Sequence, residues 1–338
     1  MTRGIALLLI GLPLLIAAGA APCHAGAIDP ELQAVLESAD PLERIPVIIS
    51  LSDKVDVQQY RSPDRKGRRS GMVKALKQRY EETVNRSSLK SLLGITDHTQ
   101  PGGMRIRPLW MINGLSVKAR PQVIHAMAGK PWVESVRLDR IVQAPPRVAT
   151  LSGTAEWNLA AVGAQELWTL GYTGQGVVVA SVDTGVDVNH PDLVSRWRGG
   201  TNSWFDANDI DFDPQVDTTP YDLDGHGTGV MGVIVGGDAG GSAIGMAPDS
   251  QWISAKIFDA NGEALLSEIH AAFQWLLDPD GDPDTDDAPD VVNNSWSFVQ
   301  NPDMCLEETM GISFRTDIQI LKQAGIAVVF SAGNGGPS

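Results

Sequence analysis

Three short segments of the sequence carry residue types that could together cleave an acyl bond. Asp183 begins an Asp-Thr-Gly segment, His226 begins His-Gly-Thr, and Asn334 ends Ala-Gly-Asn. An aspartate can hold a histidine in one tautomer, and the histidine can then take a proton from a hydroxyl nucleophile. The carboxamide of an asparagine can stabilise the resulting oxyanion. Each segment alone is typical of a turn or a helix cap, whereas their joint order indicates nucleophilic hydrolysis.

These segments lie beside apolar runs that predict the elements needed to bring them together. Near-continuous apolar runs are typical of strands buried on both faces of a parallel sheet. Strands are expected at 177–183, 251–258, 290–296 and 326–332, and helices at 224–237, 263–278 and 312–324. This alternation favours an α/β fold with a parallel sheet, in which sites form beyond the carboxyl ends of the strands. The residues that follow each strand are therefore expected to meet at one edge of the sheet.

Longer stretches around the three segments resemble the motifs of the subtilisin-like serine proteases, the subtilases. The stretches are VVVASVDTGVDVNHPDL, DGHGTGVMGVIVG and VVFSAGNGGPS, and the details NSWFDA and APDVVNNSWS look like the bacillopeptidase F branch. The resemblance runs from about Glu156 to the end. It implies an incomplete subtilisin-like catalytic domain of a serine endopeptidase, which hydrolyses polypeptides through an Asp-His-Ser triad and requires no cofactor for the chemistry.

The resemblance also implies a role for individual residues. Asp183 would be the triad aspartate, His226 the general base and Asn334 the oxyanion donor. A further set would line the cleft and pair with an extended substrate backbone. This substrate-binding set comprises Asn294, Ser295, Trp296, Ser297, Ala332 and Gly333.

The sequence departs from the family pattern in two places. The family usually has a second histidine where this chain has Gly229, one helical turn beyond the base, so we expect altered helix packing and retained chemistry. No Gly-Thr-Ser-Met segment occurs, and neither Ser331 nor Ser338 has the expected place at the start of a helix. The nucleophilic serine is therefore expected beyond the end of this chain, and the 338 residues themselves are expected to be inactive.

The first residues have the pattern of a secretory signal peptide. Arg3 is followed by an apolar run over 5–21 and then by small residues, so 1–25 is assigned to the signal. A membrane anchor is the alternative, but the run is short and contains glycine and proline. We expect a secreted protein, extracellular or periplasmic, without membrane contact after signal removal. Cys305 would then be a single thiol without an intrachain disulfide.

A small α+β domain is expected at 26–146. Strands are predicted at 46–51, within 110–119 and at 132–142, and helices at 68–93 and 121–129. This order is that of a ferredoxin-like, split βαβ domain. The domain resembles the propeptide that folds and inhibits subtilases. The remaining residues, 147–338, would be the N-terminal part of the peptidase domain.

The boundary between the two domains is rich in proline. The stretch 143–152 (QAPPRVATLS) is expected to be a linker and a protease-accessible maturation site. An alternative for the whole chain is a non-catalytic inhibitor or binding protein that acts through the propeptide-like domain.

Charge divides the chain at the same boundary. Residues 26–147 contain 20 Lys and Arg against 13 Asp and Glu, whereas residues 148–338 contain 5 against 28. The acidic part would be repelled by a phosphate backbone, so nucleic acid is not an expected partner. The opposite charges predict that the propeptide docks partly by electrostatic complementarity, as an intramolecular inhibitor.

Two acidic stretches raise the question of structural calcium. The stretch 278–290 (DPDGDPDTDDAPD) lacks the glycine and the terminal glutamate of an EF-hand loop. Its calcium candidates are Asp280, Asp282, Asp284 and Asp286, and a second acidic stretch contains Asp206, Asp209, Asp211 and Asp213. A solvated acidic surface is the alternative. A calcium-dependent surface or adhesion protein is a third hypothesis for function, which rests on these loops alone.

Overall fold

The computed structural model describes residues 27–87, 89–92, 106–145, 157–209, 218–297 and 312–334. The expected signal peptide, most of the expected linker, Cys305, Asp211, Asp213 and Ser338 lie outside these residues. Within the described part, no helix combines the length and the apolar character needed to cross a bilayer.

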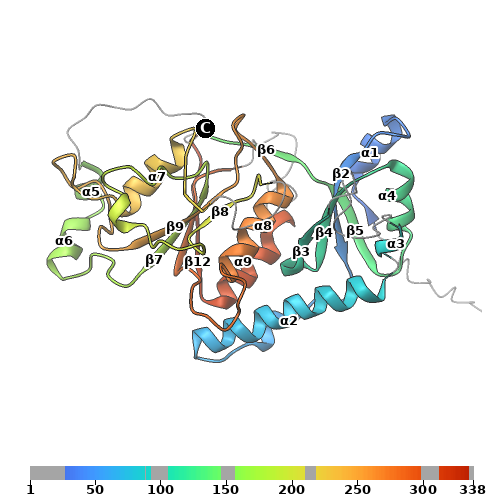
Figure 1. Ribbon diagram of the computed structural model, residues 1–338, viewed down its shortest axis with the longest axis horizontal. Coiled ribbons are helices and arrows are strands. Elements are labelled where there is room, and N and C mark those ends of the chain that lie inside the picture. The colour runs from blue at the N-terminus through green and yellow to red at the C-terminus, as the bar shows by residue number, and fades with distance from the viewer. Residues whose placement is uncertain are drawn as a thin grey trace, which may run out of the picture.

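The C-terminal half is built on a parallel sheet of five strands, as expected (Figure 1). In spatial order the strands are β12 (Ala327–Phe330), β11 (Val291–Asn294), β7 (Val178–Asp183), β9 (Gln251–Lys256) and β8 (Trp204–Asp206). Every neighbouring pair is parallel, and Asp183 lies opposite Lys256 in the register of β7 and β9. The carboxyl ends of the strands therefore share one edge.

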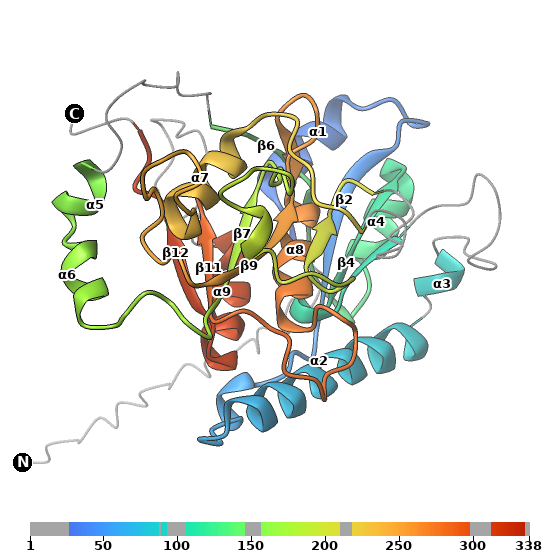
Figure 2. The same cartoon turned by 60° about the vertical axis from the view of Figure 1, so that its left-hand side comes forward.

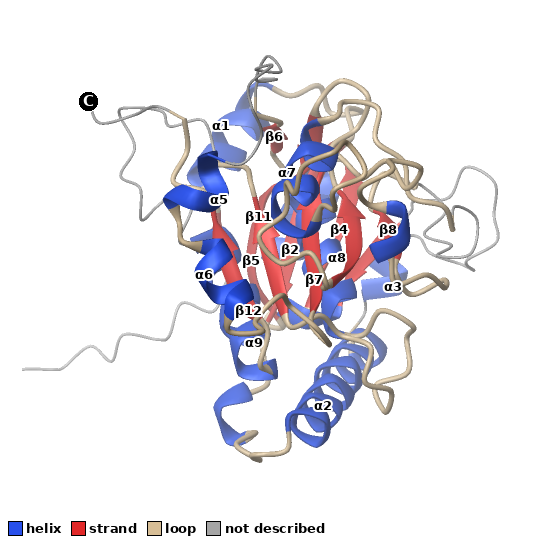
Figure 3. Ribbon diagram, turned by 90° about the vertical axis from the view of Figure 1, so that its left-hand side faces the viewer, coloured by secondary structure: helices blue, strands red, loops and turns tan. Residues whose placement is uncertain are grey.

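Helices cover both faces of this sheet (Figure 3). The helix α7 (His226–Val235) packs on one face, where Met231 and Val235 contact a cluster with Val179 and Trp252. The helices α8 (Leu266–Leu277) and α9 (Ile312–Ala324) lie against the other face, as part of the main core. Two short helices, α5 (Trp157–Ala161) and α6 (Ala164–Thr169), precede β7, and the 3₁₀ turn η3 (Val194–Arg196) follows it.

The N-terminal half contains a second sheet of five strands. Their order is β1 (Ala27–Ile28), β5 (Val133–Leu138), β2 (Ile45–Leu51), β4 (Gly114–Ala119) and β3 (Ile106–Leu109). The last four are antiparallel neighbours and have the order of a split βαβ domain, which confirms this expectation. The helices of this half are α1 (Pro30–Ser38), α2 (Arg65–Arg86), α3 (Leu89–Leu92) and α4 (Pro121–Ala128), with the 3₁₀ turns η1 (Val57–Gln59) and η2 (Trp110–Ile112).

Several element boundaries differ from those predicted. The strand expected to start at Trp110 starts at Gly114, because η2 places Met111 and Ile112 in the core and Asn113 adopts a left-handed conformation with φ of 46°. The helix expected over 68–93 is divided at Ser87 into α2 and α3. The helix expected from 263 begins with a short strand instead, β10 (Glu263–Leu265).

The two halves form a continuous apolar core around α8 and α9. Figure 1 shows these helices between the two sheets, and the core cluster joins Met72 and Met111 of the N-terminal half to Phe273 of α8. The short strand β6 (Ile141–Gln143) pairs antiparallel with β10. Asp139 accepts a hydrogen bond at 2.9 Å from the backbone N–H of Ser267, in the first turn of α8. The N-terminal half is thus held against the C-terminal half by apolar contacts, by backbone hydrogen bonds and by the capping of α8.

Ion pairs link α2 to the acidic loop that follows α8. Figure 2 shows α2 along the lower edge of the molecule. The pairs are Arg65–Asp290, Arg69–Asp286, Lys74–Asp284 and Lys77–Asp278. The basic and acidic halves therefore meet with complementary charge, which is the contact expected from the composition.

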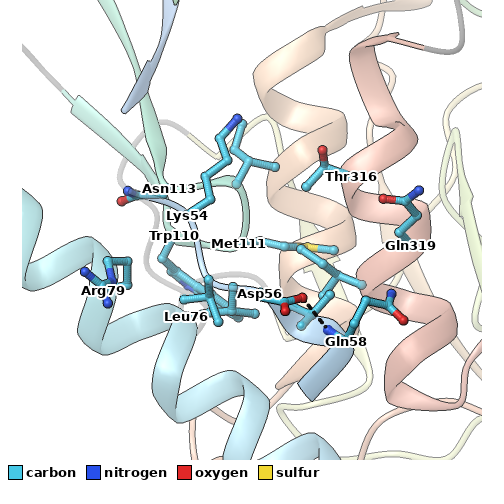
Figure 4. A pocket seen from close by; sticks show the side chains of 14 residues that line it. Lys54, Asp56, Gln58, Leu76, Arg79, Trp110, Met111, Asn113, Thr316 and Gln319 are labelled. Carbon is cyan, nitrogen blue, oxygen red and sulfur yellow. Dashed lines mark hydrogen bonds between the residues drawn. The ribbon is translucent and has the colours of Figure 1, made fainter. Parts of the chain in front are cut away.

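A pocket of about 200 Å³ also lies between the two halves (Figure 4). Its walls come from η1, α2, η2 and α9, and include Trp110, Met111 and Gln319. None of its lining residues belongs to the parallel sheet, so it does not involve the strand ends that carry the predicted chemistry.

Candidate active site

Asp183 and His226 are in direct contact. Asp183 is the last residue of β7 and is fully buried, and His226 is the first residue of α7. Nδ1 of His226 lies 2.7 Å from Oδ1 of Asp183. Because a carboxylate can only accept, Nδ1 carries the proton, and the lone pair of the neutral ring resides on Nε2. The His226 side chain is 15% exposed, and its Nε2 has no hydrogen-bond partner within the described residues.

The two groups shift one another's ionisation. The hydrogen bond that His226 donates to Asp183 raises the pKa of His226 above its ordinary value, although burial opposes this shift. Burial raises the pKa of Asp183, and the hydrogen bonds from His226 and Thr184 act in the opposite direction. A histidine with a raised pKa and an oriented ring is suited to accept a proton at Nε2 and to hold it near neutral pH.

Asp222, which the sequence analysis did not single out, fixes the start of α7. Its Oδ1 accepts from the backbone N–H groups of Asp224 and Gly225 at 3.0 and 2.8 Å. Its Oδ2 accepts from the backbone N–H and the hydroxyl of Thr228 at 2.9 and 2.7 Å. These hydrogen bonds lower the pKa of Asp222 against the effect of burial. The available signal in the sequence was an aspartate four residues before the histidine.

Glycine is required where α7 meets β7. A Cβ on Gly227 would lie 2.2 Å from the carbonyl oxygen of Gly185 and 3.1 Å from Cβ of Asp183. The backbone N–H of Gly227 donates to Oγ1 of Thr184 at 2.9 Å. This close approach lets His226 reach the buried carboxylate. By contrast, a Cβ on Gly229 would meet no atom within 4 Å, so the unusual glycine in the His-Gly-Thr motif leaves the contact intact.

Lys256 is a second functional candidate that the sequence analysis missed. It is the last residue of β9, is 3% exposed, and its ammonium donates to the carbonyl oxygens of Thr184 at 3.1 Å and of Phe258. Burial lowers its pKa, although several carboxylates oppose the shift. Lys256 thus stabilises the turn after Asp183 through its hydrogen bond to the carbonyl oxygen of Thr184. The signal in the sequence that could have identified Lys256 was its position at the end of an apolar run.

The predicted oxyanion segment follows β12 at the same edge of the sheet. Residues 331–334 are exposed, and the backbone N–H of Ser331 donates to the carbonyl oxygen of Asn294 at 3.0 Å. Gly333 adopts φ of 81°, and a Cβ on it would lie 3.9 Å from Oγ of Ser297. Since β11 separates β12 from β7, Ser331 at the start of this segment and Asp183 are two strands apart, about 10 Å. Asn334 therefore lies on the same rim as the Asp–His pair.

Two members of the predicted substrate-binding set have buried side chains. Trp296 is 1% exposed, and its indole N–H donates to the carbonyl oxygen of Val182 at 2.9 Å. Asn294 is fully buried and donates through Nδ2 to the carbonyl oxygen of Val329 at 3.0 Å. Both side chains hold the strands together, and the pairing of these residues with an extended substrate backbone stays a prediction. Ser295 and Ser297 are partly exposed, and Ala332 and Gly333 are exposed.

A second aspartate–histidine pair lies away from this site. Nδ1 of His270 is 2.9 Å from Oδ1 of Asp317, and Nε2 is 3.1 Å from a guanidinium nitrogen of Arg137. His270 is 1% exposed and Asp317 is fully buried. Because Nε2 faces another side chain inside the core, this pair connects α8, α9 and β5 and offers no access to a substrate.

The calcium candidates are only partly brought together. The carboxylate cluster that could hold a metal ion contains Asp280 with Asp278 and Asp287. Asp284 and Asp286 instead pair with Lys74 and Arg69 of α2. An oxygen of Asp282 accepts from the backbone N–H of Asp284 at 3.0 Å. Alternating aspartates in the sequence thus do not form one ligand set, because the loop turns sharply between them.

Comparison with protein families identifies a match over just under half of the chain. Residues 174–338 match the subtilase family of peptidases. This segment begins just before β7 and contains Asp183, His226 and Asn334.

Several of the curated relatives are proteases of bacteria. Bacillopeptidase F of Bacillus subtilis (strain 168) is 32% identical over 293 residues, which are 79% of this chain and 19% of that protein. The minor extracellular protease Vpr of the same organism is 32% identical over 182 residues, 52% of this chain and 20% of that protein. The thermostable alkaline protease of Halalkalibacterium halodurans is 30% identical over 217 residues, 63% of this chain and 52% of that protein. The chain thus spans about a fifth to a half of the length of these relatives.

A solved structure has the same fold. The epidermin leader peptide processing serine protease of Staphylococcus aureus superposes with a TM-score of 0.57 at 17% identity, over 87% of this chain and 61% of that chain. The similarity extends through both halves of the chain.

Proposed function

Residues 174–338 belong to the subtilase family, and on that premise we propose that the chain is part of the precursor of a secreted serine endopeptidase. In this proposal Asp183 orients His226 and stabilises its protonated ring. His226 accepts the proton of a serine hydroxyl through Nε2 and later donates it to the leaving amine. Asn334 donates to the oxyanion of the tetrahedral intermediate.

One observation carries the proposal, namely the contact between Asp183 and His226 at the carboxyl edge of a parallel sheet. The 2.7 Å hydrogen bond joins a fully buried carboxylate to a partly exposed ring. The ring directs Nε2 away from the carboxylate, and the exposed segment 331–334 lies on the same rim. We propose that a serine outside the described residues completes the triad.

We further propose that the N-terminal half acts as an intramolecular inhibitor and folding aid. Its strand β6 pairs with β10 through the register Gln143–Glu263, Val142–Ala264 and Ile141–Leu265. The backbone N–H of Ala144 continues this pairing to Gly262 at 2.6 Å. An extended peptide that adds to a sheet edge uses the same backbone hydrogen bonds, so β6 would block a substrate that binds there. The views in Figures 2 and 3 place β6 and α7 at the same end of the molecule.

The first test is the DNA sequence that follows codon 338. The proposal expects an in-frame Gly-Thr-Ser-Met segment within the next part of a peptidase domain. A native stop codon would contradict the triad and would favour the alternative of an inhibitor that acts through the N-terminal half.

The second test is hydrolysis of casein together with labelling by a fluorophosphonate. Protein expressed with the serine-containing segment should hydrolyse casein and take up the label. Its His226→Ala variant should lose activity by a factor on the order of 10⁴–10⁶. The 338-residue chain alone should show neither hydrolysis nor labelling. Hydrolysis by this chain that is lost in His226→Ala would contradict the proposal that the triad serine lies outside the described residues. A structural control is Asp317→Asn, which alters the other aspartate–histidine pair.

A further inference from the structure

We propose that Lys256 is a positioning residue of the candidate active site, which holds the backbone turn after Asp183 and thereby sets the contact between Asp183 and His226. Lys256 ends β9 and lies opposite Asp183, the last residue of β7, in the parallel register of the two strands. The effect on a reaction rests on the proposed peptidase function. The effect on the contact itself can be measured without it.

Thr184 connects both members of the aspartate–histidine pair to Lys256. Its backbone N–H donates to Oδ1 of Asp183 at 2.7 Å, and the same oxygen accepts from Nδ1 of His226. Its Oγ1 accepts from the backbone N–H of Gly227, in the first turn of α7, at 2.9 Å. Its carbonyl oxygen accepts from the Lys256 ammonium at 3.1 Å. A displacement of Thr184 would therefore disturb the buried carboxylate and the start of α7 together.

The ammonium of Lys256 also contacts two further segments of the chain. It donates to the carbonyl oxygen of Phe258, after β9, and lies 5.7 Å from the centre of the Tyr221 ring, before α7. The segment before α7 packs tightly on the turn, because Gly185 forms a β-bridge with Asp222. A Cβ on Gly185 would lie 2.0 Å from the carbonyl oxygen of Tyr221. One side chain thus joins the turn after β7, the segment after β9 and the approach to α7.

Burial makes these contacts of Lys256 more important than those of a surface lysine. The residue is 3% exposed, so its ammonium has exchanged water for the two carbonyl oxygens and the aromatic ring. Methionine has a similar length but no donor, and would remove this hydrogen bond from the carbonyl oxygen of Thr184. Removing a partner from a buried polar group is costly, so the turn is expected to move toward another donor.

The charges around the ammonium allow positioning to be distinguished from a purely electrostatic role. Burial lowers the pKa of Lys256, and neighbouring carboxylates oppose this shift. These carboxylates are Asp206, Asp222, Asp224 and Asp259. Asp222 and Asp224 also raise the pKa of His226, but the hydrogen bond to Asp183 raises it most. Loss of a cation alone would raise the pKa of His226, whereas loss of the hydrogen-bond geometry would lower it.

The test is an NMR titration of the His226 ring in the full chain with Lys256→Met. We expect the pKa of His226 to fall relative to the unaltered chain, because its hydrogen bond to Asp183 weakens. Arg198→Met is the matched control. Arg198 is a partly buried cation of the same half that also donates to two backbone carbonyl oxygens, and its loss should leave the His226 titration unchanged. Lys256→Arg keeps the charge and the donors and should reverse part of the fall.

A kinetic readout follows in protein expressed with the serine-containing segment. Lys256→Met should lower kcat by about 10- to 100-fold, since a small misplacement of a reacting group has an effect of this size. KM should change by less than about twofold, because Lys256 is buried away from a bound peptide. Lys256→Arg should recover part of the lost kcat. If the unaltered protein is inactive, the proposed function fails, while the NMR titration still decides the positioning role.

Each result of the titration decides the proposal. A raised pKa of His226 in Lys256→Met would overturn positioning in favour of an electrostatic role. An unchanged pKa in a folded variant would show that Lys256 serves stability alone. Circular dichroism establishes folding, and Lys256→Gln provides a second variant should Lys256→Met not fold. Lys256→Gln keeps one amide donor without the charge, so a fall in the pKa of His226 supports positioning and a rise or no change overturns it.

Discussion

At the scale of single residues, the site depends on one hydrogen bond between a buried acid and a partly exposed base. Asp183 is inaccessible to solvent, so its main influence on a reaction passes through His226. The group that meets a substrate is the imidazole, and the carboxylate sets its tautomer and its affinity for a proton.

Replacing Asp183 by asparagine should lower the pKa of His226. The variant loses the negative charge whose hydrogen bond raises this pKa, so burial becomes the dominant influence. We expect this decrease in the NMR titration of the histidine ring protons. Asp317→Asn should leave the His226 titration unchanged. An unaltered His226 pKa in Asp183→Asn would contradict the assigned contact.

Two glycines of α7 provide a matched pair of substitutions. Gly227→Ala would push a methyl group against the carbonyl oxygen of Gly185, and we expect a loss of about 1–3 kcal/mol in the free energy of unfolding. Gly229→Ala enters open space within a helix and should raise that free energy by about 0.5–1 kcal/mol. Urea denaturation measures both. Equal effects of the two variants would argue against the close packing of α7 on β7.

At the scale of elements, α8 carries a glutamate, Glu268, whose side chain is 13% exposed and makes the contact of α8 with the N-terminal half sensitive to pH. Burial raises the pKa of Glu268 from 4.5 to about 7. Its carboxylate accepts from the backbone N–H of Leu265 at 2.6 Å and lies 4.0 Å from Arg107 of β3. The carboxyl of the folded state thus holds its proton at pH values where the unfolded chain has lost it.

The free energy of unfolding should therefore fall as the pH rises from about 4.5 to about 7. Below this window the group is neutral in both states, and its stabilising contribution is complete. Glu268→Gln removes the titration, so its stability relative to the unaltered chain should rise across the window by on the order of 2–3 kcal/mol. Thermal unfolding at pH 4.5, 6 and 8 measures this difference, with exposed Glu81→Gln as the control. A difference in the free energy of unfolding between the two proteins that stays constant across these pH values would refute the raised pKa of Glu268.

The elements that could be predicted from sequence are those whose buried apolar residues follow a regular pattern along the chain. The central strands β7 and β9 appear as nearly continuous apolar runs because both of their faces are covered. The bounds of α9 were predicted as found, since its apolar positions recur at helical spacing. The strands β8 and β10 escaped prediction because each has three residues, and β10 exists only through its pairing with β6.

The candidate site was predictable to a similar degree. Asp183 and His226 follow from short motifs, whereas Asp222 and Lys256 act on backbone groups that only the folded chain brings near them. The resemblance placed Trp296 along the cleft, and only the folded chain shows that its indole is buried and donates to the carbonyl oxygen of Val182. The aspartates of the acidic loop were grouped by spacing, whereas the loop assembles Asp280 with Asp278 and Asp287.

At the scale of the whole molecule, charge and apolar surface both hold the N-terminal half in place. Arg69 is 1% exposed and pairs with Asp286, whereas the side chains of Lys74 and Asp284 are about half exposed. Exposed pairs are screened by salt much more than buried ones. The shared core around α8 is insensitive to such screening.

Salt should weaken the docking of the N-terminal half without abolishing it. We expect a protein nicked between residues 145 and 157 to release its N-terminal fragment more readily at physiological than at low ionic strength. Gel filtration of the nicked protein at several NaCl concentrations measures this release. Arg69→Met should increase release under all conditions, and Lys74→Met should mainly reduce its salt dependence. If retention of the N-terminal fragment does not depend on salt, apolar packing would be the dominant contribution to docking.

The pairing of β6 with β10 and the capping of α8 by Asp139 are contacts within one polypeptide. While the connection is intact, the tether gives these surfaces a millimolar effective concentration for one another. Hydrolysis of a single peptide bond between them would leave every contact in place and yet convert the interaction into a bimolecular one. Its strength would then depend on dilution, so a protein that is stable when concentrated would come apart when it spreads into a large volume.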